Sequence, residues 1–147
     1  MKMVCDTNVL LRAAINPNGL AAELLKWIRR DHVLVTSQPL LAELLLVLRR
    51  PRIRALHGRD EHGIRRFLSS LYKVAMIVHL PASLSRLVPR DPKDDAVLLT
   101  AMSASADVLT TRDQHFFDSA VLAFAARHGV RIVRDDDLLQ ELRAAGP

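Results

Sequence analysis

Short apolar runs alternate along this chain with longer stretches in which apolar residues recur every three or four positions. The short runs are typical of buried strands and predict them at 1–5, 33–35, 74–78, 108–110 and 130–133. The longer stretches predict amphipathic helices at 20–30, 38–49, 61–72, 97–102, 119–127 and 138–145. This alternation indicates an α/β fold with a mostly parallel central sheet of about five strands flanked by helices.

Length and composition favour one soluble domain spanning residues 1–147. A chain of 147 residues, half of them hydrophobic, buries enough surface to fold without disulfides. Its lone cysteine, Cys5, fits a reducing compartment. No secretory signal is visible, and no apolar run, that at 44–48 included, is long enough to span a bilayer. We therefore expect a cytoplasmic protein with no membrane partner.

Positive charge exceeds negative charge along the chain, with 21 Lys and Arg against 16 Asp and Glu and an isoelectric point of about 10.1. This excess favours a polyanionic or acidic partner. The densest positive charge lies at 49–54. That segment reads either as a helix end followed by a solvated loop, or as a contact surface for phosphate or an acidic partner through Arg49, Arg50 and Arg52.

Acidic residues occupy positions that an α/β fold would bring together. Asp6 and Asp113 follow predicted strands, and carboxyl ends of neighbouring parallel strands share one edge of a sheet. Asp94 begins the helix before Val97, and Glu43 lies within an apolar helical stripe. Each acid has a structural alternative, because aspartates cap helices and Glu43 could pair with an arginine.

The carboxylates indicate a metal site if they converge. A cluster of acids repels itself unless cations are present, and oxygen ligands without a His or Cys pattern favour Mg²⁺ or Mn²⁺. Such an ion activates water and neutralises charge at a phosphate. Together with the net positive charge, this suggests hydrolysis of nucleic-acid phosphodiester bonds.

Four segments resemble, in order and spacing, the motifs of the PIN domain, a small metal-dependent ribonuclease domain found in the toxin half of VapBC-type toxin–antitoxin pairs. Residues 4–10 (VCDTNVL) are similar to its opening motif, and 37–48, with Glu43, to its second acidic motif. Residues 91–95 (DPKDD) and 105–113 (SADVLTTRD) resemble the third and fourth. The resemblance covers nearly the whole chain.

The resemblance implies a three-layer fold and a Mg²⁺ or Mn²⁺ site whose ligands are also the catalytic residues, Asp6, Glu43, Asp94 and Asp113. Asp95 is an alternative to Asp94. Many members carry a further acid where this chain has His115, so Asp118 is its candidate substitute. Asn8 and Thr111 are expected to contact the ligand residues, and Arg112 to contact nucleic acid or a partner protein.

The resemblance further implies endoribonuclease activity, a cognate antitoxin and a homodimer. The sequence disfavours two other enzyme classes. A haloacid-dehalogenase-like site needs an aspartate where this chain has Asn8, and a receiver-like site needs an acidic pair that residues 2–4 do not supply. The alternative from a different class is a catalytically silent PIN fold that binds RNA or protein.

Overall fold

The computed structural model describes residues 1–80 and 92–146, with side chains for 1–80 and 96–146. Its strands are β1 (Lys2–Cys5), β2 (Val33–Ser37), β3 (Met76–Val78), β4 (Val108–Thr110) and β5 (Arg131–Val133). Its helices are α1 (Thr7–Ile15), α2 (Leu20–Asp31), α3 (Gln38–Arg49), α4 (Pro51–His57), α5 (Glu61–Val74), α6 (Pro92–Ser103), the short 3₁₀ helix η1 (Gln114–Phe117), α7 (Ser119–Arg127) and α8 (Asp135–Ala145).

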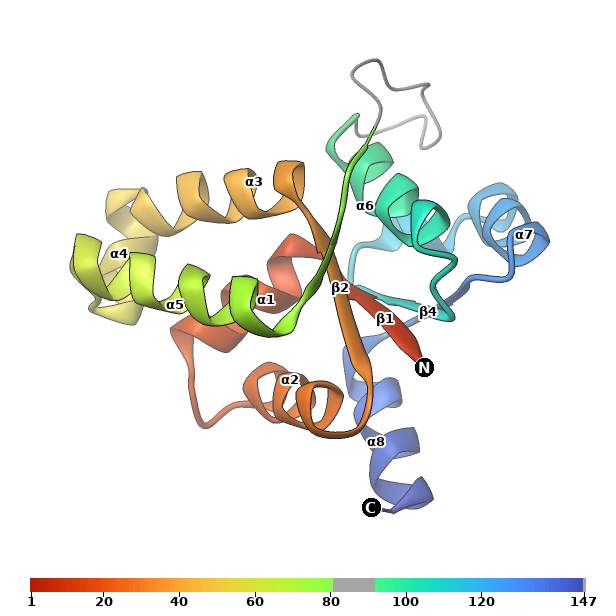
Figure 1. Cartoon of the computed structure of the whole chain (residues 1–147), viewed down its shortest axis with the longest axis horizontal. Coiled ribbons are helices and arrows are strands. Elements are labelled where there is room, and N and C mark those ends of the chain that lie inside the picture. The colour runs from red at the N-terminus through yellow and green to blue at the C-terminus, as the bar shows by residue number, and fades with distance from the viewer. Residues whose placement is uncertain (81–91, 147) are drawn as a thin grey trace.

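The described strands form one parallel sheet in the order β3-β2-β1-β4-β5, which confirms the predicted sheet (Figure 1). Strand β1 lies at the centre, where both faces are covered, and its Met3, Val4 and Cys5 are buried. A strand buried on both faces has to be apolar throughout. The apolar run that begins the chain therefore takes the central place.

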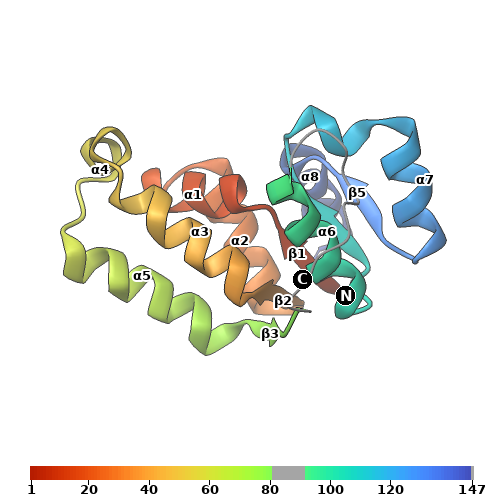
Figure 2. The ribbon, with the colours of Figure 1, turned by 90° about the horizontal axis from the view of Figure 1, so that it is seen from above.

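Side chains alternate between two hydrophobic layers because successive residues of a strand point to opposite faces. Met3 and Leu34 pack in a layer that includes buried residues of α1, α2, α3, α5 and α8. Val4 and Leu109 pack in a second layer, against α6, η1 and α7. Figure 2 shows α6 and α7 apart from α1, α2 and α3, so the three-layer architecture is confirmed.

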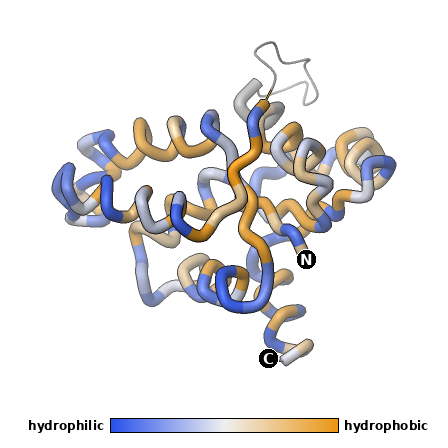
Figure 3. The backbone as a smooth tube through the Cα atoms, in the orientation of Figure 1, coloured by the Kyte–Doolittle hydropathy of each residue, from blue (hydrophilic) through white to orange (hydrophobic). Residues whose placement is uncertain are grey.

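Hydropathy along the backbone follows this layering. The tube in Figure 3 is hydrophobic along the central strands and hydrophilic around the turn between α4 and α5. None of the helices in the described part of the chain is long and apolar enough to cross a membrane.

Two α-helices are absent from the predicted order. Helix α1 begins at Thr7, directly after Asp6, because the apolar residues that follow bury its inner side. The prediction of a solvated loop within 49–54 is wrong beyond Arg50, because Pro51 begins α4 at a position where its missing N–H costs nothing. Helix α4 ends at His57 and is followed by Gly58, whose φ is +67°. No residue of α4 is fully buried, so it lacks the apolar stripe that marks a helix in sequence.

Helix α3 offers a matched test of the packing. Leu44 is fully buried in the first layer, whereas Leu46 on the same helix is 64% exposed. Leu44→Ala is expected to lower the free energy of unfolding by about 2–5 kcal/mol, because it removes buried methyl groups and leaves a cavity. Leu46→Ala should change it by less than about 0.5 kcal/mol. Urea denaturation of both variants checks this, and equal losses would contradict the assigned faces of α3.

Candidate active site

The carboxyl ends of β1 and β4 meet at one edge of the sheet. The two strands pair in parallel, with Cys5 opposite Thr110, and the Asp6 backbone N–H donates to the Thr110 carbonyl at 3.0 Å. Chain connections leave β1 toward β2 on one side, whereas β4 lies on the other. In open α/β sheets such a reversal creates a crevice where ligands bind.

Asp6 lies in this crevice and is only 5% exposed. The Thr111 hydroxyl donates a hydrogen bond of 2.8 Å to Asp6 Oδ2. Burial raises the pKa of the Asp6 carboxyl, and the nearby charges of Asp113 and Glu43 raise this pKa further, against the lowering effect of the hydrogen bond from Thr111. The charges of two carboxylates from distant parts of the chain therefore act on Asp6.

Glu43 reaches the same place from α3, and its side chain is half-buried. The Thr7 hydroxyl, in the first turn of α1, lies 3.2 Å from Glu43 Oε2 and donates to it. Thr7 itself is buried. Since α1 begins directly after Asp6, the same short segment supplies one carboxylate and positions a second.

Thr111 connects the first and third acids. Its side chain is fully buried, and its hydroxyl oxygen accepts the Asp113 backbone N–H at 3.0 Å while the hydroxyl donates to Asp6. The Asp113 carboxylate accepts the His115 backbone N–H at 3.0 Å, which caps η1. Asp113 therefore has the capping role that its position suggested, and it also faces the crevice.

These acids line one pocket of about 340 Å³. Asn8 and Arg50 contribute polar groups to it, and Val97 brings α6 to its wall. The full lining comprises Asp6, Thr7, Asn8, Leu11, Glu43, Val47, Arg50, Ile53, Val97 and Asp113. Residues that are far apart in sequence thus converge at the carboxyl edge of the sheet.

The donor set suits a hard divalent cation. Carboxylate and hydroxyl oxygens predominate among the polar lining groups, which Mg²⁺ and Mn²⁺ prefer. Burial raises the pKa of the nearby Cys5 thiol to about 12, so this thiol is protonated at neutral pH in the metal-free protein. Among the described side chains, no three His, Cys, Asp or Glu residues already form a coordination shell.

Other sequence-predicted acids lie elsewhere or outside the described side chains. Asp94 and Asp95 fall in the first turn of α6, and their side chains are outside the described residues. Asp118 is exposed and precedes α7, and it is not part of the pocket lining.

The predicted basic contact residues have different surroundings. Arg50 lines the pocket, and Arg52 is exposed on α4. Arg49 forms an ion pair with Glu61. Arg112 contacts Asp135, as described below.

Comparison with known proteins places this geometry in a family. Residues 2–115 match the family model described as PIN domain. The chain belongs to the PIN-domain family. Members of this family are generally nucleases that use divalent metals, and the matched region contains Asp6, Glu43 and Asp113.

Two relatives of this PIN domain show how far the likeness extends. This chain is 30% identical over 111 residues to "Uncharacterized protein MJ1680" of Methanocaldococcus jannaschii, and the match covers 75% of this chain and 70% of that protein. Its fold is similar to a chain in the crystal structure of VapBC2 from Rickettsia felis bound to a DNA fragment from their promoter. The TM-score is 0.57 at 15% identity, and the match covers 91% of this chain and 98% of that chain.

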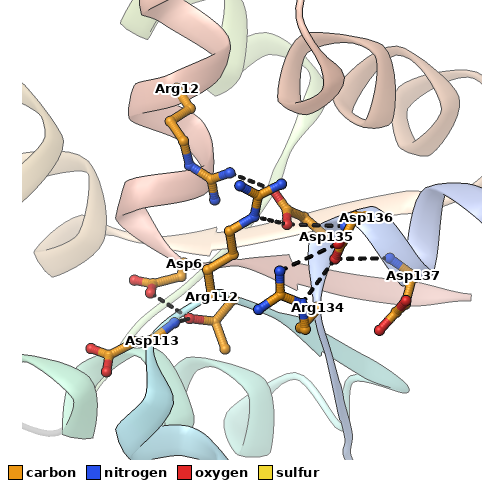
Figure 4. A network of polar contacts seen from close by, with 9 residues as sticks. Asp6, Arg12, Arg112, Asp113, Arg134, Asp135, Asp136 and Asp137 are labelled. Atoms are coloured by element: carbon orange, nitrogen blue, oxygen red, sulfur yellow. Dashed lines mark hydrogen bonds and ion pairs between the residues drawn. The ribbon is translucent and has the colours of Figure 1, made fainter.

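An ion-pair network that the sequence did not reveal lies beside the PIN-domain pocket (Figure 4). Asp135, at the start of α8, is 0% exposed and accepts hydrogen bonds from Arg12 Nη1 and Arg112 Nε, each at 2.6 Å. In the sequence, residues 135–137 simply precede the helix predicted at 138–145. Three adjacent aspartates look alike in sequence, and only the first of them is buried.

We predict that Asp135→Asn lowers the free energy of unfolding by about 2–3 kcal/mol. Removing the buried charge leaves two arginines without their anion. Because both arginines are partly exposed to solvent, the decrease in the free energy of unfolding should be smaller than for a fully buried ion pair. The matched control is Asp136→Asn, which removes an exposed ion pair with Arg134 and should have little effect. Urea denaturation compares the two, and equal losses would contradict a special role for Asp135.

Proposed function

We propose that this protein is a metal-dependent endoribonuclease that hydrolyses RNA phosphodiester bonds. The observation that supports it is the convergence of Asp6, Glu43 and Asp113 in one pocket, where burial, and to a lesser extent the other two acids, raise the pKa of Asp6. Buried carboxylates that repel one another are costly to fold, and a bound cation removes that cost. A purely structural role gives no reason to place all three there.

Asp6, Glu43 and Asp113 would hold Mg²⁺ or Mn²⁺ together with Asp94. In sequence Asp94 is three residues before Val97, a spacing that shares one face of a helix, and Val97 lines the pocket. This spacing favours Asp94 over Asp95. The bound cation would supply an activated water and neutralise charge at the scissile phosphate. Thr7 and Thr111 keep two of the carboxylates in place.

The preference for RNA phosphate as substrate is supported by positive charge beside the acids. Arg50 lies on the pocket wall, and it is followed at once by α4, which adds Arg52 and Arg54. The whole chain carries a net charge of +5. Because the acids alone would repel a polyanion, this flanking charge is what would draw RNA to the pocket.

The cellular role we propose is the toxin of a type II toxin–antitoxin pair, with a cognate antitoxin as partner. The fold shared with a chain of VapBC2 supports this role. A cytoplasmic homodimer is part of the same proposal and rests on the family likeness.

Cleavage of RNA tests the proposal directly. The wild-type protein is expected to cut single-stranded or structured RNA with Mg²⁺ or Mn²⁺ and to stop in EDTA. Asp6→Asn should lower the rate at least about 100-fold, more than 2.7 kcal/mol of transition-state stabilisation, because it removes a ligand. The matched control, Asp137→Asn, changes an exposed aspartate on α8 and should leave the rate unchanged. Gel analysis of end-labelled RNA gives the readout.

Three outcomes would overturn the nuclease proposal. Cleavage that survives EDTA contradicts metal dependence, and equal cleavage by wild type and Asp6→Asn contradicts the site. RNA binding without cleavage under any metal would instead support a catalytically silent binding module.

Thermal stability gives a second prediction that does not depend on turnover. A cation at 100 times its dissociation constant adds about 2.7 kcal/mol to the folded state, so saturating Mn²⁺ should raise the melting temperature by about 5–11 °C. Asp6→Asn should melt higher than wild type in EDTA and lose most of the response to metal. Differential scanning calorimetry measures both effects, with Asp137→Asn as control.

The increase in melting temperature that Asp6→Asn causes in EDTA should also depend on pH. The folded-state pKa of Asp6 is raised, so the folded protein is penalised once pH exceeds the unfolded-state pKa, and the penalty is complete above the folded-state pKa. The increase in melting temperature is therefore absent below the unfolded-state pKa of about 4, grows as pH rises, and is complete above the raised folded-state pKa of Asp6. If Asp6 were only a helix cap, its substitution would instead lower the melting temperature and metal would have no effect.

A further inference from the structure

A second pocket of about 370 Å³ adjoins the acidic one. The two share Asn8, Leu11 and Asp113, and the second is completed by Arg12 and Arg112. A ligand that leaves the acidic pocket past Asn8 therefore meets two guanidinium groups. The lining changes from predominantly anionic to predominantly cationic across the shared residues.

Both arginines are held in place by Asp135. Arg12 projects from α1 and Arg112 from the loop after β4, and each donates to a different oxygen of the same buried carboxylate. Figure 4 shows the two guanidinium groups meeting at this carboxylate, with Asp6 and Asp113 nearby. Two arginines on one aspartate leave one positive charge in excess, at a fixed position.

Each arginine retains donors for a further partner. Arg12 Nη2 is buried and finds no hydrogen-bond acceptor among the described residues. Arg112 uses only its Nε for Asp135, and its side chain is 42% exposed. A planar guanidinium with free N–H groups matches the oxygens of a phosphate, and an unsatisfied buried donor is costly unless a ligand accepts from it.

We propose that Arg12 and Arg112, positioned by Asp135, form a binding subsite for an RNA backbone phosphate next to the one held in the acidic pocket. The subsite deepens the proposed function and rests on it for the identity of the ligand. One phosphate carries the single negative charge that balances the excess of the cluster. The subsite fixes the direction in which an RNA strand crosses the crevice, from the acids past Asn8 toward α8.

The test measures binding of a fluorescent single-stranded RNA by anisotropy over a range of salt concentrations. EDTA is present, so that under the proposed function the RNA stays intact. The variants are Arg112→Gln and Arg12→Gln, and the matched control is Arg134→Gln, an exposed arginine that is paired with Asp136 outside this pocket. Each test variant leaves one arginine on Asp135, and a melting curve verifies that it is folded. If one variant does not fold, the other supplies the same test.

We expect each test variant to reduce the slope of log affinity against log salt by about 0.7, the value for one phosphate contact to a single strand. Arg134→Gln should leave the slope unchanged. Three results would overturn the subsite. They are an unchanged slope in a folded test variant, an equal reduction of the slope in Arg134→Gln, and no binding by the wild type at low salt.

Cleavage by the wild-type protein with Mg²⁺ is scored separately, so that the two proposals can fail independently. Cleavage with an unchanged slope in the test variants overturns the subsite and leaves the nuclease. A reduced slope without cleavage in the wild type supports the phosphate subsite and overturns the nuclease.

Discussion

Repulsion between the buried carboxylate of Asp6 and the half-buried carboxylates of Glu43 and Asp113 is the constraint on which the site depends. Asp6 is nearly inaccessible to solvent, and Asp113 and Glu43 add their charges to the effect of burial in raising its pKa. Taking a carboxylate out of water costs several kcal/mol, and like charges increase that cost. Two hydroxyl donors offset part of this cost, Thr111 on Asp6 and Thr7 on Glu43. In the function we propose, a bound divalent cation would offset the rest of this cost.

The neighbouring network applies the opposite solution to the same problem. Asp135 is as deeply buried as any acid in the described chain, yet two arginines neutralise it. Among the described residues, the crevice therefore places one set of acids beside Arg50 on the pocket wall, and one buried acid beside two arginines. The acidic pocket and the arginine cluster lie side by side. Together they suit a phosphate-containing ligand that meets a cation in the acidic pocket and places a further phosphate at the arginines.

Much of the fold and part of the site could be predicted from sequence, and the reasons differ by element. Strand β1 and helix α3 were predictable because burial imposes an apolar pattern on them. Helix α4 was not, since it buries none of its residues and its only marks are Pro51 and basic residues. Asp6 and Asp113 were predictable because each follows a strand, whereas Asp135 was hidden among three identical neighbours. Only the tertiary contacts of α1 and of the loop after β4 single it out.

The central claim, that the carboxylates of this PIN domain bind a divalent cation, is tested most directly by anomalous diffraction from crystals grown with Mn²⁺. The account predicts an anomalous peak in the acidic pocket, with carboxylate oxygens of Asp6, Glu43 and Asp113 at about 2.0–2.3 Å or one water away, and with Asp94 as a further ligand. A pocket without anomalous density in crystals soaked at saturating Mn²⁺, or a peak only at acids elsewhere on the surface, would contradict it.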